Sequence, residues 1–373
     1  WEGNADWTKE KGTATIEITP AHGQTIKQEI SAGSRSDIVE QMLKTLWSGN
    51  TRVIEHPTDI DLVGHRVVHG GPHYTESTRI TPEVKEEIQR VSSFAPLHNP
   101  INLEGIETME RLLPGVPQIA VFDTTFHSQM PQERILYPGP YAWYEQDIRR
   151  YGFHGTSHQY CAERTAHILG CNLNSLRIVN CHLGNGCSVA AIQRGHSVDT
   201  SMGFTPIDGL MMGTRTGSID PGILIYLQRE QHATADQLDQ VLNKQSGFLG
   251  ISGVSNDVRQ VEKAAAEGNA RAKLAINMFI YRLRFFIGAM IASLGGVDVI
   301  TFTAGIGEHA PEIRSATCEA FGFLNLKIDP EKNSASPMDQ DIASPDSAVR
   351  VLVVHTEEDW QIAKECWHVI HKE

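Results

Sequence analysis

Short apolar runs alternate with segments of helical periodicity along the second half of the chain. The apolar runs predict strands over residues 176–182, 187–193, 196–200, 297–303 and 349–355. Apolar positions three or four residues apart predict helices over residues 221–229, 233–243, 262–294, 311–321 and 358–371. The longest of these is expected to break near Gly268. Strands that alternate with helices indicate an α/β fold.

The first half shows the same two kinds of pattern. Its strands are expected over residues 13–18, 61–68 and 118–122, and its helices over residues 36–47, from Pro82 onward and over 102–113. Thr81 before Pro82 is a typical helix start.

The order of these elements suggests a fold. A three-strand meander followed by strand–helix units is the pattern of a ribonuclease-H-like domain, and the first half is expected to be a second copy without its opening hairpin. The boundary is expected between Asp123 and Tyr151, in a stretch rich in proline, glycine and aromatic residues. Residues 334–347 are expected to form a solvated excursion.

Composition narrows the function classes. The 373 residues include 32 basic and 45 acidic side chains, a formal net charge of −13, and 40% are hydrophobic. This composition suits a globular chain of about two domains and excludes extensive disorder. The acidic balance argues against a general nucleic-acid binder, which needs a basic face.

Targeting signals and cysteines point to a cytoplasmic protein. No apolar stretch is expected to reach the roughly 18 residues of a membrane helix, so residues 285–297 are expected to form a buried core helix and no membrane association is expected. The first residues show no basic or apolar leader pattern. The six cysteines form no C-x-x-C pair, which favours free thiols in the cytoplasm.

Two glycine-rich segments follow predicted strands. Residues 182–186 read His-Leu-Gly-Asn-Gly, and residues 305–308 read Gly-Ile-Gly-Glu just before a predicted helix. Glycines let backbone N–H groups approach phosphate oxygens, and a helix N-terminus favours an anion. Neither segment is a Walker loop or a G-x-G-x-x-G motif. Each is compatible with an ordinary turn or a phosphate loop, and their occurrence together strengthens the second interpretation.

Charged residues lie at the ends of predicted strands and in loops. Arg66 and Arg215 are close to glycines, and a guanidinium there suits a phosphate or carboxylate, or else a structural ion pair. Asp123 follows the apolar run 118–122 and Glu358 follows the run 349–355. Such carboxylates can hold Mg²⁺ through oxygen, or else lie in the first turn of a helix.

The 17 histidines are numerous for this length. His65 and His69, and likewise His154 and His158, are four residues apart and could pair on a metal, but zinc usually takes a third protein ligand and no H-E-x-x-H motif occurs. Structural histidines or ligand donors are the favoured interpretation. His98 lies in the segment Pro-Leu-His-Asn-Pro.

At these residues the sequence resembles the acetate kinase family. The matching motifs follow the family's order over nearly the whole chain. They are H-R-V-V-H-G-G at 65–71, A-P-L-H-N-P at 95–100, F-D-T-T-F-H at 122–127, Y-G-F-H-G-T-S-H at 151–158, C-H-L-G-N-G at 181–186, G-T-R-T-G-S-I-D-P at 213–221 and F-T-A-G-I-G-E at 302–308.

The resemblance implies a fold and an activity. The fold is that of the acetate and sugar kinase/Hsp70/actin superfamily, with two ribonuclease-H-like domains flanking a cleft. An acetate-side domain would comprise residues 1–124 and 360–373, and a nucleotide-binding domain residues 125–359. The implied reaction is reversible phosphoryl transfer from ATP to acetate, giving ADP and acetyl phosphate, with Mg²⁺ or Mn²⁺, in a homodimer.

The resemblance also implies roles for matching residues around the acid substrate. Asp123, His154 and Arg215 resemble the catalytic residues, and Arg66 resembles the second arginine that grips acetate and the moving phosphoryl group. The other residues that resemble the acid-binding positions are His98 and, around the methyl group, Val68, Leu97, Phe153 and Pro206. Acetate is already an oxyanion and needs no strong base, so Asp123 is expected to anchor metal or water.

Nucleotide and metal positions follow in the same way. The residues that resemble the nucleotide-binding positions are His182, Leu183, Gly184, Asn185, Gly186, Asp257, Val258, Arg259, Gly305, Ile306, Gly307, Glu308 and His309. Glu358 matches the family's magnesium glutamate. The family's asparagine in that segment is Glu357 here, so either glutamate could be the ligand.

One departure and several alternatives accompany this hypothesis. The family opens with a strand of the form N-x-G-S-S-S-x-K that faces the phosphates, and nothing from Trp1 onward matches it, so the first domain is expected to lack its opening strands. Propionate or butyrate could replace acetate, since one methylene changes binding by only about 1–3 kcal/mol. A non-catalytic actin-like nucleotide-binding module and a histidine-rich metal hydrolase are alternatives from other classes.

Overall fold

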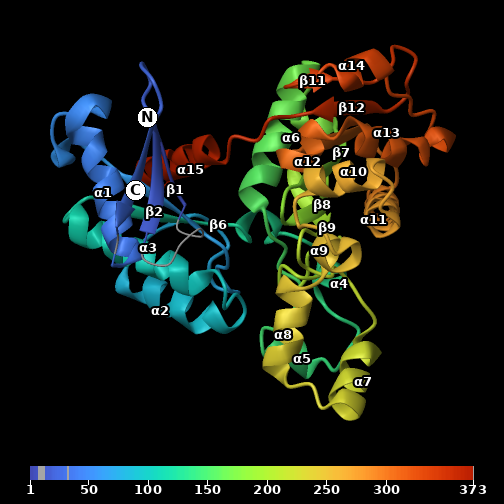
Figure 1. Ribbon diagram of the computed structural model, residues 1–373, viewed down its shortest axis with the longest axis horizontal. Coiled ribbons are helices and arrows are strands. Elements are labelled where there is room, and N and C mark those ends of the chain that lie inside the picture. Colours follow the sequence, from blue (N-terminus) through green and yellow to red (C-terminus); the bar gives the residue numbers. More distant parts are fainter. Residues whose placement is uncertain (7–12, 32, 373) are drawn as a thin grey trace. The chain divides into compact units, whose positions relative to one another are not determined.

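The computed structural model describes residues 1–6, 13–31 and 33–372, and the chain divides into two compact units (Figure 1). Unit 1 comprises Trp1–Val68, Ser77–Val121 and Ala363–Glu373, and unit 2 comprises His69–Glu76 and Phe122–Ile362. The expected domains, residues 1–124 with 360–373 and residues 125–359, stay a prediction; in the structure residues 69–76 group with unit 2.

Unit 2 is built on a six-stranded sheet with the order β11-β12-β10-β7-β8-β9. The antiparallel meander consists of β7 (Arg177–Leu183), β8 (Cys187–Gln193) and β9 (His196–Thr200). Strands β10 (Val299–Thr303) and β12 (Arg350–Val353) extend the sheet in parallel with β7. The predicted meander followed by strand–helix units is confirmed.

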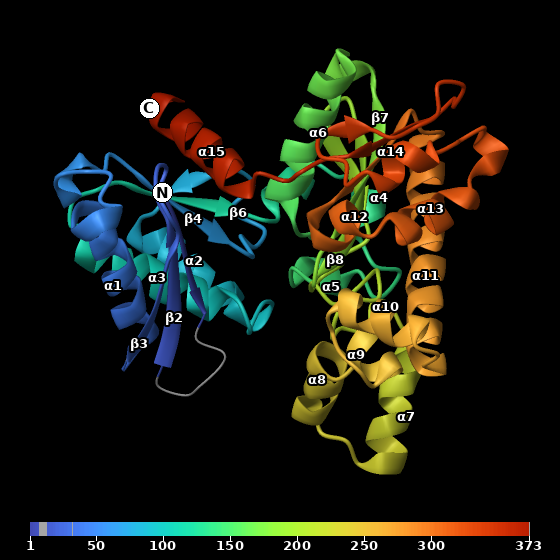
Figure 2. The ribbon, with the colours of Figure 1, turned by 45° about the horizontal axis from the view of Figure 1, so that its top comes forward.

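Helices cover both faces of this sheet (Figure 2). Helix α6 (Gly155–Leu169) packs through Cys161 and Ala166 on Ile178 of β7 and Val299 of β10, and all four side chains are buried. Helix α11 (Ala270–Leu294) lies against β7, β8 and β9. Parallel strands that are covered on both faces have nearly continuous apolar sequences, so these strands could be predicted from the sequence.

Helix α11 is more apolar than the sequence analysis expected. By length and composition alone it could cross a membrane, with a mean hydropathy of 1.5 over an 18-residue window of which 33% is buried. Phe279, Leu283 and Ile287 lie along its buried side. One side of α11 packs on the sheet as expected of a core helix, but the expected burial of residues 285–297 is wrong in part, because Phe285 is 56% exposed.

The other helices of unit 2 are α4 (Gln132–Ile135), α5 (Ala142–Glu145), α7 (Pro221–Gln231), α8 (Ala235–Lys244), α9 (Gly247–Ser252), α10 (Val258–Ala266), α12 (Ala304–His309), α13 (Pro311–Glu319) and α14 (Pro330–Ser334). Of these, α4, α5, α9 and α14 were not predicted from the sequence. The segment expected as a glycine turn after β10 is the short helix α12. The expected solvated excursion at 334–347 is wrong in part, because β11 (Gln340–Asp341) pairs with β12 and Ile342 is fully buried.

Unit 1 contains two small sheets and their helices. The first sheet joins β1 (Glu2–Asp6), β2 (Thr13–Thr19) and β3 (Ile26–Ser31), and its core packs on α1 (Arg35–Trp47) through Ile38. The second has the order β4-β6-β5, with β4 (Val63–Val67), β5 (Thr78–Arg79) and β6 (Gln118–Phe122).

The helices of unit 1 follow the predicted signals. Thr81 caps α2 (Pro82–Arg90) by accepting a hydrogen bond from the Val84 N–H, as its position before Pro82 predicted. Helix α3 (Asn99–Leu112) packs against β4. The last helix, α15 (Glu358–Lys372), begins in unit 2, and residues 363 onward belong to unit 1.

Candidate active site

The turn between β7 and β8 is the centre of the site in unit 2. The Gly184 N–H donates to the Gly186 carbonyl at 3.0 Å, which closes the turn tightly. The Gly213 N–H donates to the Asn185 carbonyl at 3.0 Å, and a Cβ on Gly213 would lie 2.1 Å from Asn185 Oδ1. Gly213 therefore lies directly against the turn, where an added side chain would force the Asn185 side chain to move.

Two cationic or potentially cationic side chains converge on Gly186. A Cβ added to Gly186 would lie 3.3 Å from His154 Nε2 and 3.6 Å from Arg215 Nη1. The absence of a side chain here therefore leaves a small space faced by an imidazole and a guanidinium. An anionic group on the backbone of the turn would meet both.

His154 is held at a strained position where α6 begins. It is the N-cap residue with φ 58 and ψ 27, in the left-handed region that few non-glycine residues adopt. The next residue, Gly155, donates its N–H to the Asp123 carbonyl at 2.9 Å, and a Cβ there would lie 2.2 Å from that oxygen. This contact joins the end of β6 to the start of α6, so it places the buried Asp123 and His154 in one region of unit 2. Such strain costs about 1–3 kcal/mol and is commonly found at functional sites.

Arg215 is positioned by the backbone of its own loop and of the loop 201–209. Its Nη1 donates to the Pro206 carbonyl at 3.2 Å and lies 3.9 Å from the Met212 sulfur. Burial lowers the pKa of the Arg215 guanidinium from its ordinary value. A charge withdrawn from water in this way interacts strongly with any anion that replaces the water.

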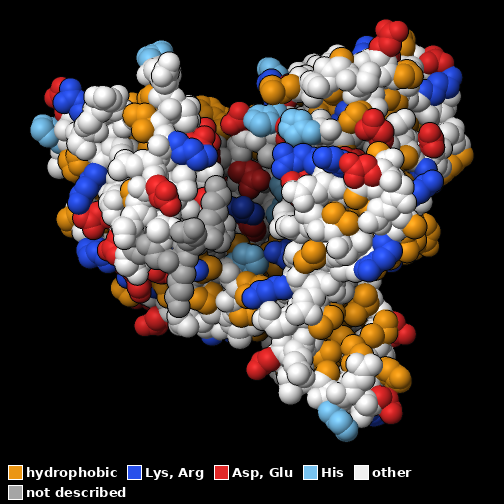
Figure 3. Space-filling model, in the orientation of Figure 1, with side chains coloured by type: hydrophobic (Ala, Val, Ile, Leu, Met, Phe, Trp, Pro, Cys, Tyr) orange, Lys and Arg blue, Asp and Glu red, His pale blue; other side chains and the backbone are white. Residues whose placement is uncertain are grey.

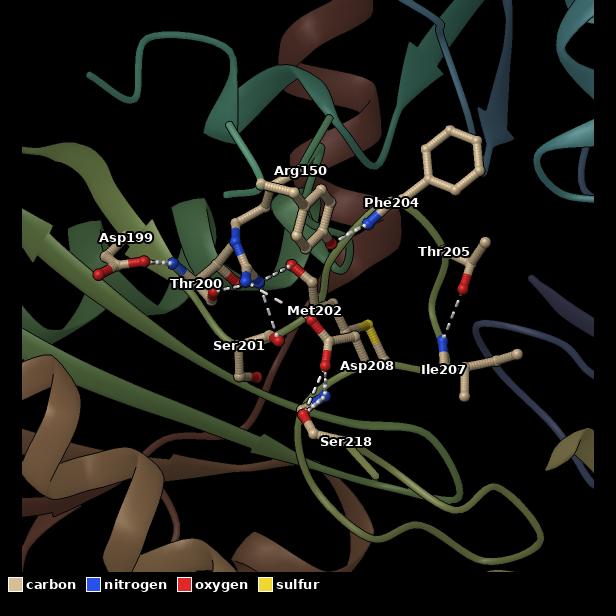
Figure 4. Close-up of polar contacts among 12 residues, drawn as sticks. Arg150, Asp199, Thr200, Ser201, Met202, Phe204, Thr205, Ile207, Asp208 and Ser218 are labelled. Carbon is tan, nitrogen blue, oxygen red and sulfur yellow. Dashed lines mark hydrogen bonds and ion pairs between the residues drawn. The ribbon is translucent and has the colours of Figure 1, made fainter. Parts of the chain in front are cut away.

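Arg150 in turn organises the loop that carries Pro206 (Figure 4). Its Nη1 donates to the carbonyls of Thr200, Ser201 and Met202 at 3.0, 3.1 and 2.8 Å. Its Nη2 lies 3.5 Å from Asp208 Oδ2, and Asp208 accepts a short hydrogen bond from the Ser218 hydroxyl. Arg150 was not among the residues predicted from the sequence, and its role is to fix loop geometry.

A cavity of about 470 Å³ adjoins the turn. Its lining residues come from the turn, the start of α10 and the helix α12: Gly184, Asn185, Asn256, Asp257, Val258, Arg259, Glu262, Gly305, Ile306, His309 and Ala310. Most of them were predicted as nucleotide-binding positions. Asn256, Glu262 and Ala310 were not, although Asn256 directly precedes the predicted segment 257–259.

Polar groups at the cavity mouth are paired locally. Asp257 caps α10 by accepting the Arg259 N–H at 2.9 Å, and its carboxylate lies 2.6 Å from Arg259 Nη2. Hydrogen bonding from Arg259 lowers the pKa of Asp257. Glu262, by contrast, has its pKa raised by burial and by the nearby carboxylates of Glu312 and Asp257.

Several predicted nucleotide residues are buried and do not line the cavity. Leu183 is fully buried, and Gly307 is buried within α12. The Glu308 carboxylate accepts the Ala304 N–H at 3.0 Å and lies 2.7 Å from His355 Nδ1, so it supports the start of α12. His182 stacks on the His154 ring at a centroid distance of 4.2 Å.

His182 is also linked to the acidic segment before α15. Its Nδ1 lies 2.8 Å from Ser157 Oγ, which accepts a hydrogen bond from the Thr356 hydroxyl at 3.0 Å. Two residues later Glu358 is half-buried, whereas Glu357 is exposed and lies 3.9 Å from His355 Nε2.

Few side chains of the described residues could bind a divalent cation. Among the described residues, no group of three or more His, Cys, Asp and Glu side chains could hold a metal ion. Mg²⁺ in phosphoryl-transfer sites usually takes only one or two carboxylates together with substrate phosphates and water. A single half-buried glutamate such as Glu358, two residues after Thr356 in the sequence, fits that mode.

The remaining predicted substrate residues are divided between the units. Phe153, buried, and Pro206, half-buried, belong to unit 2. The four others belong to unit 1: Arg66, Val68, Leu97 and His98. In that unit the Val68 N–H donates to Asn102 Oδ1 at 3.1 Å, which ties the end of β4 to the helix α3 that His98 precedes.

Together, a meander-led mixed sheet, a glycine turn with two convergent cationic groups and an adjoining cavity define a phosphotransferase of the acetate and sugar kinase fold. The chain belongs to the acetokinase family, whose model matches residues 1–364.

Individual relatives agree with this assignment. The chain is 58% identical to an acetate kinase of Cyanothece sp. over 370 residues, covering 99% of this chain and 91% of the relative, and 58% identical to an acetate kinase of Trichormus variabilis, covering 100% and 92%. Among solved structures it is similar to Porphyromonas gingivalis acetate kinase, with 40% identity, a TM-score of 0.91, and coverage of 99% of this chain and 92% of that one. It is also similar to a propionate kinase of Francisella tularensis, with 38% identity, a TM-score of 0.87, and coverage of 97% and 94%.

Proposed function

We propose that the protein is an acetate kinase that transfers the γ-phosphoryl group of ATP reversibly to acetate, giving ADP and acetyl phosphate. Family membership supports the reaction class. The observation that carries the proposal is the convergence of His154 and Arg215 on Gly186, beside a cavity of about 470 Å³. A non-catalytic nucleotide-binding module needs no such pair of groups at its phosphate turn.

The chemistry needs positioning and charge neutralisation more than covalent help. An acetate oxygen forms a bond to the γ-phosphorus as the bond from that phosphorus to the β,γ-bridging oxygen breaks, and ADP leaves with the electron pair. Negative charge on the equatorial oxygens would be offset by the Arg215 guanidinium and by an N–H of His154. Arg66 and His98 of unit 1 are proposed to bind the carboxylate of acetate.

The nucleotide is proposed to occupy the cavity between the turn and α10. Gly184 and Asn185 of the turn would lie against the phosphates, while Asp257 and Arg259 would contact the adenosine. Mg²⁺, or Mn²⁺, would be held by Glu358 and would supply neutralisation of phosphate charge. Asp123, buried at the end of β6, is proposed to anchor water or metal rather than accept a proton.

The acid specificity is proposed to depend on Val68, Leu97, Phe153 and Pro206. The similarity to a propionate kinase makes propionate the second candidate substrate. A series of acetate, propionate and butyrate, each assayed for acyl phosphate as the hydroxamate, tests the proposal through kcat/KM. The highest kcat/KM for acetate supports it. ATP hydrolysis that no carboxylic acid stimulates would refute carboxylate kinase activity altogether.

We also propose that the protein is a homodimer. Large apolar side chains are exposed on α7 and α11, including Ile223, Tyr226 and Phe285, at 47%, 58% and 56%. Figure 3 shows hydrophobic side chains gathered over α7. Exposed apolar area of this kind is typical of an interface with another copy. A cytoplasmic location is proposed as well, supported by the six free cysteines.

A further inference from the structure

A chain of hydrogen bonds runs from the core of unit 2 to His154. Asn180 Nδ2 lies 2.8 Å from His158 Nδ1, His158 Nε2 lies 2.8 Å from Ser188 Oγ, and Ser188 Oγ lies 2.8 Å from His154 Nδ1. Asn180, His158 and Ser188 are all 0% exposed. Water therefore does not compete for these bonds.

The topology explains why these side chains meet. Asn180 and His182 are two residues apart on β7 and share a face, and Ser188 on β8 is paired directly with His182. His154 and His158 are four residues apart at the start of α6 and share the side of the helix that covers this face. The hydroxyl of Ser188 is thereby enclosed between two imidazole rings.

The orientation of the Asn180 amide sets a direction for the chain. In the structure its nitrogen faces His158 Nδ1 and donates to it, so Nδ1 accepts and carries no hydrogen, while the buried Asn180 Oδ1 has no hydrogen-bond partner among the described residues. The opposite amide orientation would reverse the direction, and the tautomer, measured by ¹⁵N NMR, distinguishes the two. Burial lowers the pKa of His158 well below its ordinary value, and the neighbouring His127 and His182 lower it further. His158 is therefore neutral, with its one hydrogen on Nε2, from which it donates to Ser188 Oγ.

The Ser188 hydroxyl connects the two histidines, so the hydrogen position on His158 determines the one on His154. In the described part of the chain, Ser188 Oγ makes hydrogen bonds to these two rings. Having accepted from His158, the hydroxyl donates its own hydrogen to His154 Nδ1. A neutral His154 then carries its hydrogen on Nε2, the atom that lies 3.3 Å from where a Cβ on Gly186 would be.

We infer that Ser188 is a positioning residue: together with Asn180 and His158 it holds neutral His154 in the Nε2–H tautomer, so that an N–H donor faces the transferring phosphoryl group. This inference rests on the proposed phosphotransferase function for its catalytic consequence, but the tautomer itself does not. A neutral donor at this point does not depend on protonation of the imidazole, whereas the other tautomer would turn a lone pair toward a phosphate oxygen.

The tautomer is tested first, by ¹⁵N NMR of the full-length protein labelled at histidine, without nucleotide and at a pH where His154 is neutral. Spectra of His154→Gln and His158→Gln identify the two rings. The expected result is an unprotonated Nδ1 and a protonated Nε2 for both. A neutral His154 with its hydrogen on Nδ1 overturns the inference, whether or not the protein phosphorylates acetate.

The catalytic consequence is tested by Ser188→Ala. We expect kcat for acetyl phosphate formation to fall roughly tenfold to a hundredfold, as when the hydrogen-bond partner of a metal-ligating histidine is removed, with little change in KM for ATP. Ser188→Thr keeps a hydroxyl and should recover part of the loss. Thr301→Val removes an equally buried hydroxyl from β10, bonded to Thr165 at 3.1 Å, and should leave kcat unchanged.

A double-mutant cycle separates positioning from a general packing effect. In a His154→Ala background, Ser188→Ala should have almost no further effect on kcat, because the group that Ser188 orients is gone. If the loss of kcat in the double variant equals the product of the losses in the two single variants, the positioning role of Ser188 is overturned. If Ser188→Ala does not fold, the ¹⁵N spectrum of the unmodified protein still decides the tautomer.

Discussion

Replacing Arg215 by alanine is expected to lower kcat by at least about a hundredfold while the protein remains folded. The guanidinium is held over the turn by one bond of 3.2 Å to the Pro206 carbonyl, and burial lowers its pKa. Its charge is therefore weakly screened where the phosphoryl group is proposed to pass. Removing one such donor typically costs about 3 kcal/mol of transition-state stabilisation, and about 2.7 kcal/mol corresponds to a hundredfold in rate.

The measurement is steady-state formation of acetyl phosphate, trapped as the hydroxamate, at saturating ATP and acetate. Arg215→Lys keeps a positive charge but loses the planar fork, so it should fall between the alanine variant and the unmodified protein. Free guanidinium added to Arg215→Ala should restore part of the rate. Arg164→Ala serves as the matched control, since it removes another partly buried arginine, paired with Asp339 at 2.8 Å on the far end of α6 from His154.

The outcome that contradicts this reasoning is specific. A kcat within a few fold of the unmodified protein for Arg215→Ala, with circular dichroism unchanged, would mean that the guanidinium at Gly186 does not stabilise the transition state. A raised KM for ATP with unchanged kcat would instead assign Arg215 to ground-state binding of the nucleotide.

The other predictions concern the turn, the pH dependence of stability and the assembly. Gly213→Ala would place a Cβ 2.1 Å from Asn185 Oδ1, so KM for ATP should rise several fold; an unchanged KM would show that the turn can move without cost. Burial lowers the pKa of the fully buried His127 to about 4, so the unfolded chain takes up a proton first as pH falls, and the free energy of unfolding should drop by about 3 kcal/mol between about pH 6.5 and 4. In urea titrations, the free energy of unfolding of His127→Gln should change less steeply with pH than that of the unmodified protein, and equal pH dependence would contradict this. Tyr226→Glu should shift the mass measured by light scattering from dimer to monomer, whereas a dimer that persists would place the interface elsewhere.

The meander of unit 2 was predictable because its signals are local. Strands β7, β8 and β9 are apolar runs separated by a Gly-Asn-Gly turn and an Arg-Gly turn, and each predicted strand lies within about one residue of the observed one. The break between α10 and α11 follows from Gly268, which has φ +96. In these places the residue types alone favour one backbone conformation.

Helix α6 was missed because its first turns carry no apolar pattern. It begins with Gly-Thr-Ser-His, residues of modest helix propensity, and its buried side consists largely of small and polar side chains. Its start is set by the contact of Gly155 with the Asp123 carbonyl, 32 residues earlier in the chain. Tertiary packing rather than propensity stabilises this helix, so a reading of local periodicity could not find it.

The same limit applies to α12. Ala304 has a left-handed φ of 63, a conformation that sequence analysis would expect at the neighbouring Gly305 instead. The Glu308 carboxylate stabilises the start of α12 by accepting a hydrogen bond from the Ala304 N–H. Glu308 resembles a nucleotide-binding position of the family, and that assignment stays a prediction. In the structure its buried carboxylate supports the backbone at the start of α12.

The histidine pair of α6 shows where spacing stops being informative. His154 and His158 are four positions apart, which puts both rings on one side of α6, and from the sequence this spacing suggested a shared metal as one alternative. What joins the rings in the structure is the Ser188 hydroxyl, which reaches them because the register of β7 and β8 sets Ser188 opposite His182. Spacing along one element shows which side chains share a face, but the group that they face is decided by strand register and by the packing of α6 on the sheet. The chemistry of a histidine pair therefore depends on the group that both rings contact. Here that group is the Ser188 hydroxyl, which can accept a hydrogen bond from one ring and donate one to the other.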